Sequence, residues 1–182
     1  SDLLDLSRLE SGQSPPIWEP VHAEEAAEDV VSSFAALARS SRVALDHLDR
    51  GVPMVVSDAD RVRRILEVLV DNAIKYTAAR HGDGGGRVDV LTGPGEGGGA
   101  RLEVVDNGPG IEAEHLPRLF ERFYRVDKAR SRELGGTGLG LSIARHLAEG
   151  MGASITVESE PGRGTRFIVA VPARPDPENP PA

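Results

Sequence analysis

The sequence predicts an α/β fold, a two-layer sandwich in which one mixed β-sheet packs against three main helices. A chain of 182 residues is long enough to bury one sizeable core without disulfides or metals. Amphipathic helical segments alternate irregularly with short apolar segments of strand character. Paired strands in the second half argue against the regular alternation of a doubly wound nucleotide fold.

The composition excludes several classes of protein. The chain has no cysteine, which excludes a disulfide scaffold and any thiolate metal site. Lysine and arginine number 21 against 29 aspartates and glutamates, a net charge of −8, so we expect no nucleic-acid partner bound through a basic face. No apolar run approaches the ~20 residues that a membrane-spanning helix needs.

The first half of the chain contains two predicted helices separated by short strands. Residues 1–13 carry leucines at helical spacing and are expected to be the end of an amphipathic helix, followed by a linker and a short strand at 17–21. A helix is predicted over 23–39, followed by strands at 42–48 and 52–56. Ser57 or Asp58 is expected to cap the second helix, whose apolar stripe is Val62, Ile65, Leu66, Leu69, Val70, Ala73 and Ile74.

The second half predicts two pairs of strands and a third long helix. Strands 87–91 and 101–105 are expected to pair around a glycine-rich loop, and strands 154–158 and 165–171 around a second turn. A short helix is expected over 113–123, a charged loop over 124–135 and a long helix over 138–150. The proline-rich tail, 173–182, is expected to be disordered.

The polar face of the second helix is the first candidate for chemistry. Asn72, Lys75 and Tyr76 stand at i, i+3 and i+4 and so share one surface. An amide oxygen beside an ammonium suits Mg²⁺ with a polyphosphate. The alternative is a solvated face whose last-turn lysine favours the helix dipole.

Asp106 and the glycines after it form the second candidate. Asp106 ends an apolar strand and is followed by Gly108 and Gly110, so a carboxylate can accept from an exocyclic amine while the backbone passes close to a flat ring. The same run is also good turn chemistry, which is the alternative.

A third candidate is the glycine-rich run that leads into the last long helix. Gly136, Thr137, Gly138, Leu139 and Gly140 would expose backbone N–H groups at the helix N-terminus toward an anion. The run lacks the Lys-Ser/Thr ending of a P-loop and the dinucleotide spacing. A flexible hinge is the alternative.

The segment before this run is a candidate lid. Three aromatic residues lie at Phe120, Phe123 and Tyr124 among arginines that include Arg125, and more charges follow. Aromatic anchors beneath a cationic loop suit closure over phosphates. The alternative is that the aromatic residues only anchor the chain locally and that the charged residues after them are simply solvated.

Read in order, these motifs resemble those of the catalytic and ATP-binding domain of two-component sensor histidine kinases, in the GHKL ATPase superfamily. The segments that carry the resemblance are 71–77 for the N box, 106–110 for the G1 box, 120–125 for the F box, 136–141 for the G2 box and 162–165 for the last glycine motif. The resemblance covers residues 14–172 and implies a Bergerat-type ATP-binding fold. Residues 1–13 resemble the end of the dimerisation and phosphoacceptor domain.

The resemblance also implies a role for each matching residue. Asn72 would ligate Mg²⁺, Lys75 would meet the phosphates and Tyr76 would lie near the base or ribose. Asp106 would take the adenine amino group, with Gly108, Gly110 and Thr165 shaping that pocket. Arg125 would approach the γ-phosphate, and the backbone of the glycine-rich run would wrap the triphosphate; this run is Gly136, Thr137, Gly138, Leu139 and Gly140.

Two departures from the family pattern qualify the expectation. Val68 stands one turn before Asn72, where the family usually has a second asparagine and where hydrolytic relatives have a general-base glutamate. None of the five histidines has the acid-and-proline context of a phosphoacceptor. The resemblance therefore implies a kinase domain whose acceptor histidine lies upstream of this chain, rather than an efficient ATPase.

The expected function is transfer of the ATP γ-phosphate to that histidine, for relay to a response-regulator aspartate. The implied partners are the protein's own dimerisation domain and a cognate response regulator, in a homodimer whose cytoplasmic domain is tethered to a membrane. A degenerate nucleotide-binding or regulator-docking module, suggested by Val68, is the alternative. A serine kinase or ATPase of the same superfamily is a third.

Overall fold

The protein is described by a computed structural model that covers residues 15–82, 84–127 and 136–174. The predicted helix at 1–13, most of the charged loop and the tail from residue 175 lie outside these ranges.

A five-stranded mixed sheet forms one layer of the molecule. Its order is β2-β4-β5-β7-β6. β2 runs parallel to β4, whereas the other neighbours are antiparallel. The strands are β2 (Val43–Asp49), β4 (Gly86–Pro94), β5 (Ala100–Asp106), β6 (Ser154–Glu160) and β7 (Gly164–Val171). A separate antiparallel pair joins β1 (Glu19–Val21) to β3 (Val55–Ser57).

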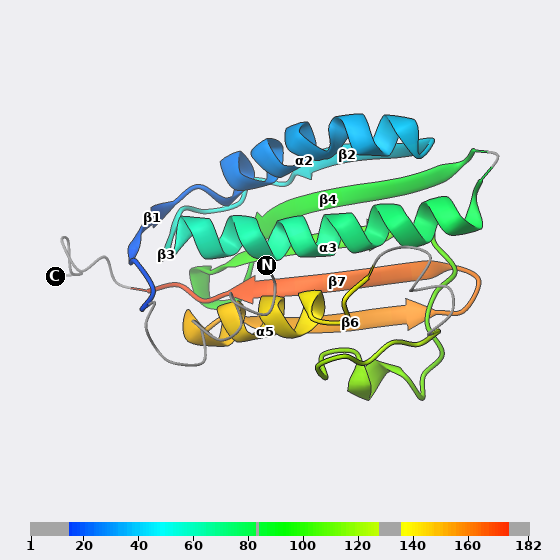
Figure 1. Cartoon of the computed structure of the whole chain (residues 1–182). Coiled ribbons are helices and arrows are strands. Elements are labelled where there is room, and N and C mark those ends of the chain that lie inside the picture. Colours follow the sequence, from blue (N-terminus) through cyan, green and yellow to red (C-terminus); the bar gives the residue numbers. More distant parts are fainter. Residues whose placement is uncertain (1–14, 83, 128–135, 175–182) are drawn as a thin grey trace, which may run out of the picture.

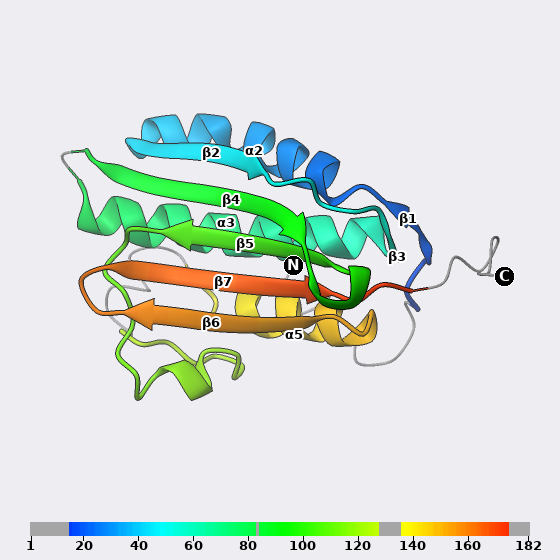
Figure 2. The same ribbon diagram turned by 180° about the vertical axis from the view of Figure 1, so that it is seen from behind.

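Three helices form the second layer, which confirms the predicted sandwich. They are α2 (Ala23–Ser40), α3 (Ala59–Arg80) and α5 (Gly140–Gly150), and they lie together over one face of the sheet (Figure 1). Seen from behind, the sheet lies in front of these helices, and none of them crosses its other face (Figure 2). In the part of the chain that the structure describes, no helix combines the length and apolarity needed to cross a bilayer.

The central helix α3 is held by its apolar stripe and by an N-terminal cap. Every residue of the predicted stripe is at most 4% exposed, and Thr77 extends it by one turn. The stripe packs against the inward residues of the sheet, which include Val88, Val90, Leu102 and Val104. Of the two possible caps, Asp58 is the one used, since its carboxylate accepts from the Arg61 N–H at 3.0 Å.

Charged side chains cover the face of the sheet that has no helices. Arg87 pairs with Asp46 and Asp89, and Arg166 pairs with Glu103 and Glu158, at distances from 2.7 to 3.7 Å. Exposed pairs of this kind add little stability individually. They keep the outer face polar, so the helix layer is where the core and the cavity lie.

The prediction of a short helix over 113–123 is wrong. That segment contains a single 3-10 turn, η2 (Leu116–Arg118). Pro117 offers no N–H to continue a helix, and Phe123 adopts a left-handed φ of 60°. Leu119 and Phe120 instead turn inward, and the Phe120 ring meets Phe167 of β7 edge to face with 6.3 Å between the centroids.

Candidate functional site

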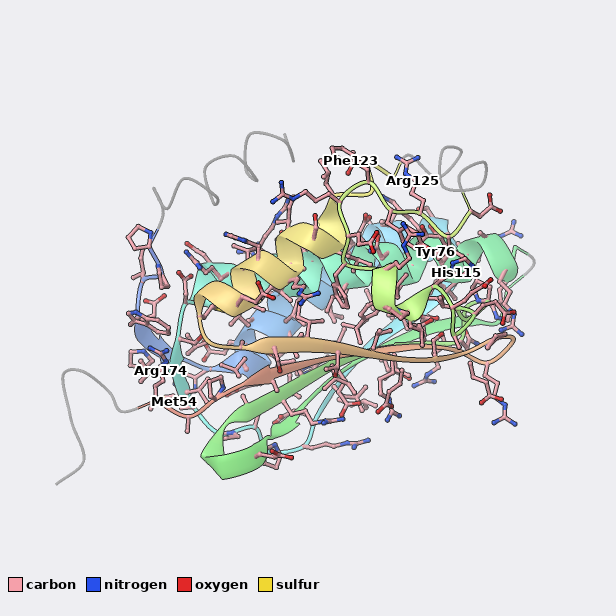
Figure 3. All side chains as sticks on the ribbon, turned by 90° about the horizontal axis from the view of Figure 1, so that it is seen from below. Met54, Tyr76, His115, Phe123, Arg125 and Arg174 are labelled. Atoms are coloured by element: carbon pink, nitrogen blue, oxygen red, sulfur yellow. The ribbon has the colours of Figure 1, made fainter. Side chains whose placement is uncertain are left out.

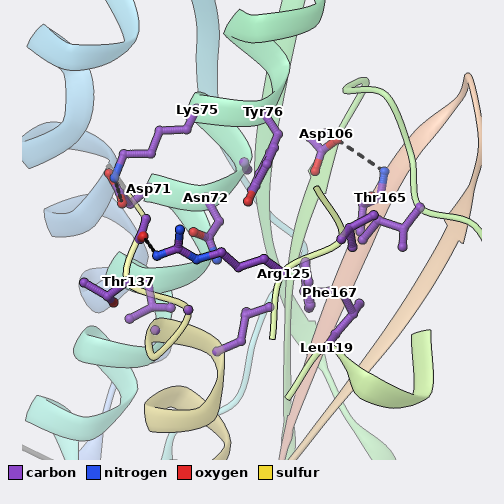
Figure 4. A pocket seen from close by; sticks show the side chains of 18 of the residues that line it. Asp71, Asn72, Lys75, Tyr76, Asp106, Leu119, Arg125, Thr137, Thr165 and Phe167 are labelled. Carbon is purple, nitrogen blue, oxygen red and sulfur yellow. Dashed lines mark hydrogen bonds and ion pairs between the residues drawn. The ribbon is translucent and has the colours of Figure 1, made fainter. Parts of the chain in front are cut away.

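A cavity of about 440 Å³ lies between α3, the ends of β5 and β7, the loop after β5, and the segments that contain Leu119 and Gly138. This volume is within the range of small-molecule sites. Most of the predicted site residues line it, although they come from segments far apart in the sequence: Asn72, Lys75, Tyr76, Asp106, Gly110, Arg125, Gly136, Thr137, Gly138, Gly140 and Thr165. Figure 4 shows Asp106 and Thr165 at one end and Lys75 with Asp71 at the other.

Two predicted residues lie outside the cavity wall. The Leu139 side chain is buried in the hydrophobic core, and its carbonyl accepts from the Ile143 N–H at the start of α5. Gly108 is buried behind Asp106, where an added Cβ would lie 2.7 Å from the Asp106 Oδ1. A side chain at Gly108 would therefore displace the carboxylate.

The Asp106 carboxyl is the most perturbed acid of the site. Its Oδ1 accepts from the Gly108 N–H at 2.8 Å and from the Thr165 N–H at 3.3 Å, across the β5–β7 pairing. Burial raises the pKa of Asp106 to about 6, although these two hydrogen bonds oppose the shift. A carboxyl held in this way presents a fixed acceptor to the cavity.

A hydroxyl pair ties the neighbouring loop to the end of the sheet. The Ser159 Oγ lies 2.9 Å from the Thr165 Oγ1 and accepts from the Ile111 N–H at 2.9 Å. Gly110 has a left-handed φ of 72°, and a Cβ there would collide with the Glu160 carbonyl. Glycine is therefore required where this loop crosses the β6–β7 turn.

At the other end of the cavity, the Lys75 ammonium is paired within its own helix. Its Nζ lies 2.6 Å from the Asp71 Oδ2, and both side chains are about one-third exposed. Sequence reasoning treated Lys75 as the cation that meets an anion and gave Asp71 no role. The i,i+4 spacing of the two residues is the signal that could have identified the pair.

The candidate lid is joined at its base to the glycine-rich run. The Phe123 N–H donates to the Gly138 carbonyl at 2.9 Å, and the Arg125 guanidinium donates to the Gly136 carbonyl. The Tyr124 hydroxyl lies 2.6 Å from the His115 Nδ1, and the Arg118 guanidinium lies 4.3 Å from the centre of the Tyr124 ring. These contacts hold the first part of the candidate lid, through Arg125, against the cavity.

An apolar wall completes the cavity, and sequence reasoning missed most of it. Its members are Ile111, Leu119, Leu141, Ile143 and Phe167. The inward alternation along β7 could have identified Phe167, whereas Leu119 enters only because the predicted short helix does not form. An apolar wall beside one fixed carboxyl suits a flat ring that carries an amine.

Val68, the apolar residue one turn before Asn72, lies beside Gly140 at the start of α5. Val68 lines the cavity, and a Cβ added to Gly140 would lie 3.3 Å from its Cγ1. The neighbouring Glu67 carboxylate is held 3.3 Å from both Arg63 and Arg64. The Glu67 carboxylate at this turn of α3 is therefore engaged by two arginines.

The comparison with protein families agrees with this geometry. The family described as "Histidine kinase-, DNA gyrase B-, and HSP90-like ATPase" matches residues 57–175. The chain belongs to this ATPase family. The match covers α3, the whole of β4 to β7 and every residue that lines the cavity except Phe34.

Similar members of this ATPase family are named as sensor histidine kinases. The chain is 35% identical over 178 residues to the sensor-like histidine kinase SenX3 of Mycolicibacterium smegmatis, covering 98% of this chain and 45% of that protein. It is 44% identical over 117 residues to the sensor histidine kinase YkoH of Bacillus subtilis, covering 64% of this chain and 24% of that protein. The chain thus spans less than half the length of these curated relatives.

A solved structure supports the fold of this family member. Full-length ShkA in complex with AMPPNP superposes with a TM-score of 0.80 at 28% identity, covering 94% of this chain and 34% of that chain. The agreement extends to the mixed sheet and three helices described above.

Proposed function

We propose that this chain is the ATP-binding catalytic domain of a sensor histidine kinase, which transfers the γ-phosphate of ATP to a histidine outside residues 1–182. The observation that carries the proposal is one cavity with a fixed carboxyl at one end and cationic groups with a glycine-rich backbone at the other. The carboxyl end suits an adenine base, and the cationic end suits a polyphosphate. The family and the named relatives support the same function.

At the carboxyl end, Asp106 would accept from the exocyclic amine of adenine. Oδ1 is already held by Gly108 and Thr165, which leaves Oδ2 for the base. The apolar wall with Phe167 would contact the ring, and Gly110 would keep the loop backbone close to it. Tyr76, which lines the cavity one helical position after Lys75, would lie near the base or ribose.

At the cationic end, Lys75 would exchange its Asp71 partner for a phosphate oxygen. Arg125 would likewise leave the Gly136 carbonyl for the γ-phosphate. The backbone of the run Gly136, Thr137, Gly138, Leu139 and Gly140 would supply N–H donors around the triphosphate. Phosphoryl transfer relies mainly on such positioning and charge neutralisation.

The residues present also fit Mg²⁺. This ion binds one or two protein oxygens and takes its other ligands from phosphates and water. The Asn72 amide in the cavity wall is a ligand of this kind, and the described residues contain no cluster of three or more acidic or histidine side chains that would form a separate metal cage. When bound, Mg²⁺ supplies charge neutralisation between the phosphates.

The proposal extends to the parent protein. Residues 1–13 would end the dimerisation and phosphoacceptor domain, and 14–172 would form the catalytic domain. The parent protein would be a membrane-anchored homodimer with this domain in the cytoplasm. Its partners would be that upstream domain and a response regulator.

Calorimetric titration with a non-hydrolysable ATP analogue, with and without Mg²⁺, tests the proposal. We expect binding that Mg²⁺ strengthens and that Asp106→Ala abolishes. We also expect no self-phosphorylation of this chain and robust phosphorylation once the upstream helices are restored. A folded wild-type chain that binds no nucleotide would overturn the proposal and favour a docking module.

A further inference from the structure

The loop that carries Asp106 is fastened from outside the cavity by two residues at the end of α3. The Arg80 Nη1 donates to the carbonyl oxygens of Asn107 at 3.1 Å and of Gly108 at 2.5 Å. The His81 Nε2 lies 2.9 Å from the same Asn107 oxygen. Neither Arg80 nor His81 lines the cavity, so both act on the loop and leave the ligand space free.

Asn107 fastens the same loop to the N-terminal end of β4. Its Oδ1 accepts from the Arg87 N–H at 2.8 Å, and its Nδ2 donates to the Gly85 carbonyl at 2.9 Å. Its backbone N–H also donates to the Arg87 carbonyl at 3.2 Å. The residue after Asp106 is therefore bonded on one side to α3 and on the other to β4.

These bonds act on the carboxyl through a short path. Arg80 holds the Gly108 carbonyl, and the N–H of the same glycine donates to the Asp106 Oδ1 at 2.8 Å. Gly108 is buried, and its position sets which way the carboxyl faces. Movement of the loop by a fraction of a hydrogen-bond length would therefore turn Oδ2 away from a ligand amine.

We propose that Arg80, His81 and Asn107 form a clasp that positions Asp106 for adenine recognition. The inference rests on the proposed function and adds three positioning residues to it. A last-turn arginine also favours the helix dipole, but that role needs no particular partner. Arg80 instead reaches two consecutive carbonyls of one loop, 27 and 28 residues along the chain.

The chain provides a matched control for this arginine. Arg39 is the basic residue in the last turn of α2, as Arg80 is in the last turn of α3, and both side chains are exposed. Arg39→Ala thus removes a helix-terminal charge without touching the loop. Arg80→Lys keeps the charge and a donor nitrogen but loses the rigid, planar guanidinium that holds Nη1 between the two carbonyls.

Calorimetry with adenosine, ADP and a non-hydrolysable ATP analogue tests the clasp. We expect Arg80→Ala and Asn107→Ala to weaken binding of all three ligands by the same factor, about tenfold, because the loss is confined to the base. Arg80→Lys should recover part of this affinity, and Arg39→Ala should bind like wild type. A loss that grows with the number of phosphates would contradict the clasp.

Amide hydrogen exchange gives a readout that does not require a ligand. We expect the Gly108 N–H to exchange at least about tenfold faster in Arg80→Ala and in the milder His81→Gln, with no change in Arg39→Ala. If the wild type binds adenosine but the Arg80 variants show unchanged exchange and affinity, the clasp is overturned and the proposed function still stands. Failure of the wild type to bind any of the three ligands would overturn the proposed function.

Discussion

At the scale of single residues, Asp106, the carboxyl proposed to recognise adenine, lowers the stability of the ligand-free protein at neutral pH. The unfolded chain releases the proton of this residue near the ordinary pKa of 3.8, whereas burial raises the folded pKa to about 6. Between these values the unfolded state binds fewer protons, so the free energy of unfolding falls as pH rises. Above pH 6 this loss of free energy of unfolding reaches its full value, which for the pKa shift of Asp106 is roughly 3 kcal/mol.

We therefore expect Asp106→Asn to stabilise the ligand-free protein at pH 7.5. The gain should be about 2 kcal/mol in urea unfolding and should shrink toward zero near pH 3, below the unfolded pKa of 3.8, where the wild-type carboxyl is largely protonated in both states. The exposed Asp29→Asn on α2 is the control, and it should show no such pH dependence. Equal effects at both pH values would rule out the burial of Asp106 as the cause.

The Lys75–Asp71 pair predicts opposite effects for its two members. Lys75→Met should weaken binding of an ATP analogue roughly tenfold and leave adenosine unaffected, since a charge-assisted bond to phosphate is lost. In the absence of Mg²⁺, Asp71→Asn should strengthen triphosphate binding, because it frees the ammonium and removes a negative charge. Titration of both variants with both ligands measures the difference, and a loss of adenosine binding in Lys75→Met would contradict this assignment.

At the scale of elements, the base of the lid depends on two left-handed residues that face each other. Phe123 has a φ of 60° and Gly138 a φ of 73°, and they share the Phe123 N–H to Gly138 carbonyl bond. The Phe123 side chain is 62% exposed, so the contact with Gly138 is made by its backbone. A Cβ on Gly138 would lie 2.9 Å from the Phe123 Cα.

Gly138→Ala should therefore weaken binding of the ATP analogue at least about tenfold, because the added methyl separates the two ends of the lid. Gly162→Ala is the matched control, since Gly162 has a φ of 80° and open space around its Cβ position. Both variants bear the cost of a left-handed alanine, about 1 kcal/mol, but only the first moves the lid. Equal affinities in a calorimetric comparison would show that the Phe123 contact has no role.

At the scale of the whole molecule, the cavity and the small β1–β3 sheet lie at opposite ends. Figure 3 shows Tyr76, His115 and Arg125 at one end and Met54 and Arg174 at the other. At that second end, the Asp58 carboxylate joins the segment before β1 to α3 by accepting from the Ile17 N–H at 2.9 Å. The Arg174 guanidinium stacks 4.0 Å from the centre of the Trp18 ring.

Asp58→Ala should lower the free energy of unfolding by about 2–3 kcal/mol. It removes the cap of α3, leaves the Ile17 N–H without its acceptor and leaves the Arg61 guanidinium without a carboxylate 3.3 Å away. Asp60→Ala, exposed in the same first turn, should cost only a few tenths of a kcal/mol. Urea unfolding of the two variants tests the difference, and similar costs would mean that Asp58 acts through the helix dipole alone.

Local patterns were sufficient to predict most of the fold. The stripe on α3 and the pairing of β4 with β5 follow from spacing and turn chemistry, because periodic burial is written into consecutive residues. The predicted polar and glycine residues also converge on one cavity, although five separate segments contribute them. The helix predicted over 113–123 failed because burial of Leu119 and Phe120 against the sheet outweighed local periodicity.

The partners of the site's side chains follow from the folded chain, because each depends on residues that are distant in sequence. Arg80 meets the loop at Asn107, Thr165 meets Asp106, and Phe123 meets Gly138 only after the sheet and helices have packed. Leu139 likewise packs into the core, although it belongs to the glycine-rich run predicted to surround the triphosphate. Residue types and spacing determine which chemistry is available to this protein, and long-range packing determines which atoms carry it out.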